Sequence, residues 1–140
     1  MTYLADAVRQ RVRQRAGNRC EYCLSHQEYV LGQLQVDHVQ PVARGGADTE
    51  DNLCLACELC NQYKWTRTHG LDPASGEQVA LFNPRQDTWA EHFAWSADGT
   101  EIVGLTPCGR ATIRMLRLNN ALAVTVRQNW VRAGWHPPAV

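Results

Sequence analysis

The segment that decides the fold runs from residue 36 to residue 64 and reads VDHVQPVARGGADTEDNLCLACELCNQYK. It begins with an adjacent aspartate and histidine, Asp37 and His38. Asn52 follows His38 by 14 residues, and Asn61 follows Asn52 by nine. We interpret these four side chains as one candidate site, because their residue types suit metal binding and proton transfer.

Two Cys-x-x-Cys pairs bracket this site, Cys20/Cys23 before it and Cys57/Cys60 at its end, with 33 residues between Cys23 and Cys57. Two intervening residues let both thiolates of a pair point at one ion, so two pairs predict a four-thiolate structural zinc site. The alternative is buried free thiols or a redox pair, which would not explain two matched pairs. Since the N-terminus lacks the pattern of a secretion signal, we expect a cytoplasmic protein and no disulfide framework.

Hydrophobic periodicity predicts an α+β fold. Leu4, Val8 and Val12 recur every four residues and predict an N-terminal helix over residues 3–16. Residues 34–39 read as a strand, residues 53–55 as a returning strand, and residues 57–67 as a helix. The order strand, turn, strand, helix is a ββα unit. Because Asp37 and His38 are neighbours, a regular strand would point them to opposite faces, so we expect the strand to end or bend there.

Residues 71–140 are predicted to form a C-terminal extension packed on a core of residues 1–70. Residues 71–77 are rich in turn formers and join the two parts. A hairpin is expected from residues 93–95 and 101–105, with its turn at Ser96-Ala97-Asp98-Gly99. Two helices follow. The first has Thr106 as N-cap and Pro107 at its first position, and the second covers about residues 120–133.

The candidate site suits hydrolysis of a phosphodiester. His38 is the candidate general base, because an imidazole accepts a proton near neutral pH. Asp37 and Asn61 offer oxygen ligands, which suit Mg²⁺ or Mn²⁺. Asn52 is expected to organise the loop that holds His38. Three basic side chains are candidate phosphate contacts: Lys64, Arg44 and Arg15.

These motifs resemble the HNH endonuclease family, whose fold is the ββα-metal or His-Me finger, a treble-clef-like unit. The matching positions cover about residues 15–67. The resemblance implies that His38 is the base, Asn52 the middle asparagine, and Asp37 and Asn61 the ligands of the catalytic ion. It also implies hydrolysis of DNA that leaves 5′-phosphate and 3′-hydroxyl ends. The tail from Phe82 to Thr106 is similar to an extension of a bacterial-type subgroup of that family.

Net charge is zero, with 14 basic and 14 acidic residues, so bulk charge does not indicate a nucleic-acid partner. The distribution is more informative, because no acidic residue follows Glu101 while five arginines do. Arginines also gather before Cys20. Basic ends favour contacts with phosphate backbones, although solvated helix faces would give the same pattern. No run reaches the roughly 20 apolar residues that span a membrane.

Three functions compete. The first is a metal-dependent endonuclease, and the complete set of Asp37, His38, Asn52 and Asn61 favours it. The second is a zinc-stabilised module that binds nucleic acid without cutting it. The third is a zinc scaffold for protein contacts alone, against which the arginine clusters argue.

Overall fold

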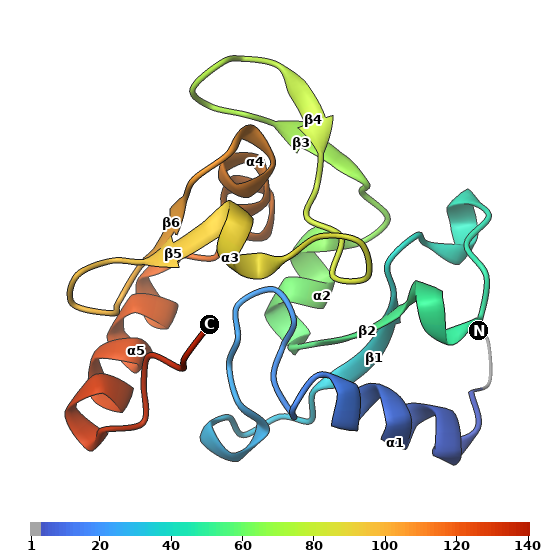
Figure 1. The fold of residues 1–140 in the computed structure, drawn as a ribbon, viewed down its shortest axis with the longest axis horizontal. Helices are drawn as coiled ribbons and strands as arrows, with labels where there is room; N and C mark the ends of the chain where they lie inside the picture. The colour runs from blue at the N-terminus through green and yellow to red at the C-terminus, as the bar shows by residue number, and fades with distance from the viewer. Residues whose placement is uncertain (1–3) are drawn as a thin grey trace. The chain divides into compact units, whose positions relative to one another are not determined.

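The computed structural model describes residues 4–140, and these divide into two compact units (Figure 1). The first unit includes the chain to Thr68 and the short segment Asn83–Gln86, and the second contains His69–Phe82 and Asp87–Val140. The fold is mixed α+β, as predicted. The expected division into domains at residue 70, with the second packed on the first, stays a prediction.

The first unit contains the predicted ββα arrangement. Strand β1 (Gln35–His38) pairs antiparallel with β2 (Leu53–Ala56), in a register that places His38 opposite Leu53. Helix α2 (Glu58–Lys64) follows β2 directly. Short 3-10 turns at 27–29, 42–44 and 50–52 occupy the connections. Helix α2 is shorter than the predicted 57–67, because the chain turns out of helical geometry at Trp65.

Helix α1 (Asp6–Arg15) lies along the β1–β2 ribbon (Figure 1) and packs against it in a small core. Leu4 and Val12 are buried with Leu34, Leu53 and Leu55, while Val8 packs against the group. The apolar stripe read from the sequence is therefore the buried face of α1. The first residue of the predicted helix, Tyr3, lies outside the described residues.

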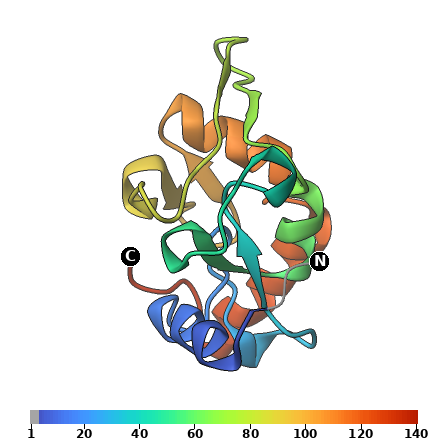
Figure 2. The ribbon, with the colours of Figure 1, turned by 90° about the vertical axis from the view of Figure 1, so that its right-hand side faces the viewer.

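The second unit consists of two hairpins and three helices. Strands β3 (His69–Leu71) and β4 (Gln78–Ala80) form one hairpin, which lies against α4 with its turn projecting beyond it (Figure 2). The sequence reading assigned residues 71–77 to a joining segment and missed this hairpin. Strands β5 (Phe93–Trp95) and β6 (Ile102–Gly104) form the predicted one, after a short helix α3 (Trp89–His92).

Helices α4 (Pro107–Leu116) and α5 (Ala121–Ala133) confirm the two helices predicted after the hairpin. The side chains of Thr106 and Asn120 accept hydrogen bonds from Gly109 N and Ala123 N, so both helices have the N-caps that their sequences indicate. Arg127 is buried and donates to the carbonyl oxygens of Thr100 and Leu118, so this arginine stabilises the fold. Among the described residues, no helix has the length and apolar character needed to cross a membrane.

Candidate active site and metal centre

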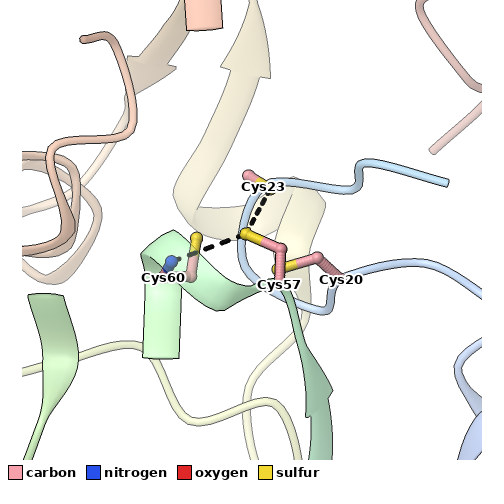
Figure 3. A group of neighbouring side chains, drawn as sticks. All are labelled: Cys20, Cys23, Cys57 and Cys60. Atoms are coloured by element: carbon pink, nitrogen blue, oxygen red, sulfur yellow. Dashed lines mark hydrogen bonds between the residues drawn. The ribbon is translucent and has the colours of Figure 1, made fainter. Parts of the chain in front are cut away.

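The two cysteine pairs meet at one point. Cys20 and Cys23 come from the loop after α1, and Cys57 and Cys60 from the N-terminus of α2, with their sulfur atoms directed toward one another (Figure 3). The ligand atoms all lie within 4.8 Å of one another, and Cys23 Sγ lies 3.7 Å from Cys57 Sγ. This cluster could hold a zinc ion, as the spacing predicted.

Electrostatics favours ionisation of one thiol in this group. Hydrogen bonds from Cys20, Cys57 and Cys60 hold the pKa of the Cys23 thiol well below its ordinary value, against the opposing effect of burial. A thiolate is the form that binds metal. Cys54 behaves differently, since burial raises its pKa to about 12. Cys54 is fully buried in β2, with its Sγ 3.8 Å from the hydroxyl oxygen of Tyr22, so it packs in the interior outside the cluster.

A salt bridge ties the 83–86 segment to the first cysteine pair. The guanidinium of Arg85 donates to Glu21 Oε1, and Glu21 Oε2 accepts from Leu55 N. Burial raises the pKa of the Glu21 carboxyl, and the positive charge of Arg85 opposes this shift. The knuckle between Cys20 and Cys23 is therefore braced by β2 on one side and by Arg85 on the other.

Asp37, His38 and Asn61 line one open cavity of about 420 Å³. Strand β1 ends at His38, which agrees with the expectation that a regular strand could not present both neighbours to one site. Asn61 lies in α2, one residue after Cys60, and lines the cavity from that helix. Its Nδ2 donates to Gln35 Oε1 at 3.0 Å, which leaves Oδ1 as the acceptor atom of the amide.

The ring of His38 has a partner that the sequence reading did not identify. Its Nε2 lies 2.7 Å from Asp48 Oδ1, and the histidine side chain is 16% exposed. An ionised carboxylate only accepts hydrogen bonds, so Nε2 carries the proton and Nδ1 is left unprotonated in the neutral ring. The sequence around Asp48 is simply polar, and no spacing rule singles this residue out.

Asn52 holds the loop that follows β1. Its Oδ1 accepts from Gln40 N at 2.9 Å, and its Nδ2 donates to Gln40 O and Ala47 O at 3.1 and 2.8 Å. Its own carbonyl oxygen accepts from Val39 N. These bonds fix both ends of the loop that carries Asp48, without touching the imidazole itself.

The three candidate phosphate contacts are placed differently from one another. Lys64 is buried at 2% exposure, with Nζ 3.3 Å from His38 O, and desolvation lowers its pKa although the charge of Asp37 opposes the shift. Arg15 donates to the carbonyl oxygens of Glu50 and Leu53. Arg44 Nε donates to Thr66 O at 2.6 Å, and its side chain is exposed. All three bind backbone carbonyls around the site.

A second group of metal-binding side chains lies in the second unit. Asp87, His92 and Cys108 have ligand atoms within 4.8 Å of one another and are half-buried. His92 Nδ1 lies 2.7 Å from Thr106 Oγ1, and its ring packs edge-on against Phe82. No short-range sequence motif joins these three residues, which are brought together by the fold.

Comparison with known proteins identifies one domain. Residues 20–67 match the family model described as HNH endonuclease, which confirms the resemblance and covers about a third of the chain. The matched stretch contains all four clustered cysteines and every residue named as lining the cavity between Asp37 and Thr66. Searches of curated proteins and of solved structures found no match to the chain. The match indicates a nuclease-type function.

Proposed function

We propose that this protein is a metal-dependent endonuclease that hydrolyses phosphodiester bonds in DNA. The observation that carries the proposal is the shared cavity: a carboxylate, an imidazole and an amide from β1 and α2 line one open site within the matched domain. A non-catalytic module would need no such combination of donors beside a zinc cluster. The four thiols are assigned to structural Zn²⁺.

The donors of the cavity fit a hard divalent ion. Asp37 offers carboxylate oxygens, and Asn61 offers its Oδ1 because Gln35 occupies Nδ2. Oxygen ligands of this kind suit Mg²⁺ or Mn²⁺. When bound, the ion supplies Lewis-acid stabilisation of the negative charge that develops on the phosphate oxygens.

His38 is assigned as the general base. Its Nδ1 takes a proton from the attacking water, while Asp48 holds Nε2–H and stabilises the imidazolium that forms. Asn52 positions the loop that carries Asp48. Lys64 is assigned a positioning role, since its ammonium group is buried against the carbonyl oxygen of His38. Arg44 and Arg15 remain the proposed contacts for the substrate's phosphates.

The first test is cleavage of supercoiled plasmid with Mg²⁺ or Mn²⁺. Wild type is compared with His38→Ala and with His69→Ala, a matched control at an exposed histidine in the second unit. We expect His38→Ala to lose roughly 10²- to 10⁴-fold in rate and the control to keep its rate. Products with 5′-phosphate and 3′-hydroxyl ends are expected.

Equal rates for wild type and His38→Ala would overturn the assignment of the base. If no variant cuts plasmid, single-stranded DNA or RNA, while zinc is bound and DNA is retained, the protein is the binding module instead.

A further inference from the structure

Helix α2 ends in an unusual way. Trp65, directly after Lys64, has φ 48° and ψ −123°, and its side chain is 68% exposed. A positive φ is uncommon for a bulky residue, and it persists only where the surrounding structure holds it. A glycine would adopt it freely. The position therefore holds a large aromatic side chain where the backbone disfavours one.

Hydrogen bonds hold the backbone on both sides of the Trp65 side chain. Trp65 N donates to Asn61 O, and the next carbonyl oxygen, of Thr66, accepts from Arg44 Nε. The guanidinium of Arg67 lies 5.8 Å from the centroid of the indole ring and donates to Tyr63 O. The contact with Arg67 leaves the ring exposed, since the arginine side chain is itself exposed.

Trp65 also lines the cavity that contains Asp37, His38 and Asn61. An isolated exposed aromatic side chain is ordinary on a protein surface. This one combines exposure, a strained backbone and a place at the candidate active site. The ring contributes little to the core, so its large apolar face is left for something that enters the cavity.

We infer that Trp65 is a stacking platform for one nucleobase beside the scissile phosphate, so that the substrate is single-stranded or locally unpaired DNA. The inference rests on the proposed nuclease function and specifies its substrate class. Bases inside a duplex are stacked on both faces, whereas an unpaired base has a face free to lie on an aromatic ring. The guanidinium of Arg67, 5.8 Å from the centroid of the indole ring, adds a positive charge beside the platform that would attract a phosphate of the same strand.

The test measures binding without cleavage, in the His38→Ala background. Fluorescence anisotropy reports the affinity for a labelled single-stranded oligonucleotide and for the duplex of the same sequence. The variants are Trp65→Phe, Trp65→Ala and Trp65→Gly, with Trp135→Ala as a matched exposed tryptophan in the second unit. Stacking on one ring predicts a loss of roughly tenfold for single strands in the Ala and Gly variants.

We expect the Phe variant and the Trp135 control to bind within about twofold of the parent, and duplex binding to change less than single-strand binding. Because glycine relieves the backbone strain, Trp65→Gly should also unfold at a higher temperature than Trp65→Ala. Unchanged single-strand affinity, or an equal loss for duplex and single strand, would overturn the platform. A Trp65→Gly variant that is less stable than the parent would show that the ring stabilises the fold, and this result would also overturn the platform.

The two proposals fail separately. If wild type cuts DNA but Trp65→Ala binds single strands normally, the nuclease stands and the platform falls. If wild type cuts nothing but Trp65→Ala still weakens single-strand binding, the platform stands in a protein that binds without cutting.

Discussion

The four-cysteine cluster and the Asp37–His38–Asn61 cavity are two donor sets that both use helix α2, and they differ in ligand type and in exposure to solvent. The cluster is made of soft sulfur ligands, of which three are buried. The cavity holds harder oxygen and nitrogen ligands and is open to solvent. A closed, four-ligand set suits an ion that stabilises a fold, and an open set suits one that meets a substrate. The difference predicts that disturbing the cluster mainly lowers the stability of the fold, whereas disturbing the cavity mainly lowers the rate of cleavage.

The largest effect is expected from the thiols. In Cys57→Ser/Cys60→Ser the first unit should lose its fold, because structural zinc contributes roughly 10–16 kcal/mol in zinc-finger peptides, as much as the whole stability of a domain. Zinc content and circular dichroism measure this, with Cys54→Ala as the buried cysteine outside the cluster. A double variant that unfolds at the wild-type temperature would mean that the cluster does not stabilise the fold.

A smaller effect is expected from Arg85→Ala, which leaves Glu21 buried without its partner. Both side chains are nearly buried, at 13% and 14% exposure, so the free energy of unfolding should fall by about 3 kcal/mol at neutral pH. The double variant Arg85→Ala/Glu21→Gln should recover most of this loss, since it removes the unpaired charge.

The Arg85→Ala variant also has a pH signature. Burial already raises the pKa of Glu21, and losing Arg85 raises it further. A carboxyl with a raised folded-state pKa stabilises below its ordinary pKa, and this stability is lost as pH rises through the folded value. The cost of the variant should therefore be larger at pH 7.5 than at pH 4.5 in urea unfolding. Equal costs would show that Glu21 is not the group responsible.

Asn52→Ala should cost less stability and still impair the cavity. It removes three hydrogen bonds that hold Gln40 and Ala47, with an expected loss of about 1–3 kcal/mol. Cleavage should fall by roughly tenfold or more, because Asp48 no longer holds the ring of His38 in place. Asn52→Asp keeps the oxygen that accepts from Gln40 N, so its stability and cleavage rate should lie between those of wild type and Asn52→Ala. Full activity in Asn52→Ala would separate the loop from catalysis.

The smallest stability change should come from withholding the hard ion. In buffer free of Mg²⁺ and Mn²⁺, cleavage should stop, while the free energy of unfolding changes by less than about 0.5 kcal/mol for an ion present near its dissociation constant. Zinc should stay at one per chain. If the unfolding temperature falls as steeply as in the cysteine variants, the two donor sets are not independent.

Sequence patterns predicted the parts of this molecule that short-range rules determine. Paired cysteines, the strand that ends at His38 and the cap at Thr106 each have a local cause. The β3–β4 hairpin was not predicted, because each strand has only three residues, too few to show a hydrophobic period. Its turn residues also resemble those of a linker.

The support of the cavity was harder to predict, because it depends on tertiary contacts. Lysine is rarely buried, so the place of Lys64 under β1 could not be read from its type or spacing. The bond between Asp48 and His38 joins a loop to a strand end across ten residues of irregular chain. Trp65 is exposed and has a positive φ, and neither could be read from its residue type, because tryptophan by itself favours the core. The roles given to all these residues stay predictions.

Helix α2 places Cys60 and Asn61 at consecutive positions, so the helix fixes the angle between one ligand of each donor set. An α-helix turns by about 100° per residue, and one inserted residue between them would carry Asn61 to another side of the helix. The exposed residues 31–33 carry no ligand of either set, so a change of length there would leave both sets in place. Among related sequences, length changes should therefore gather near residues 28–33 and be absent from residues 57–64.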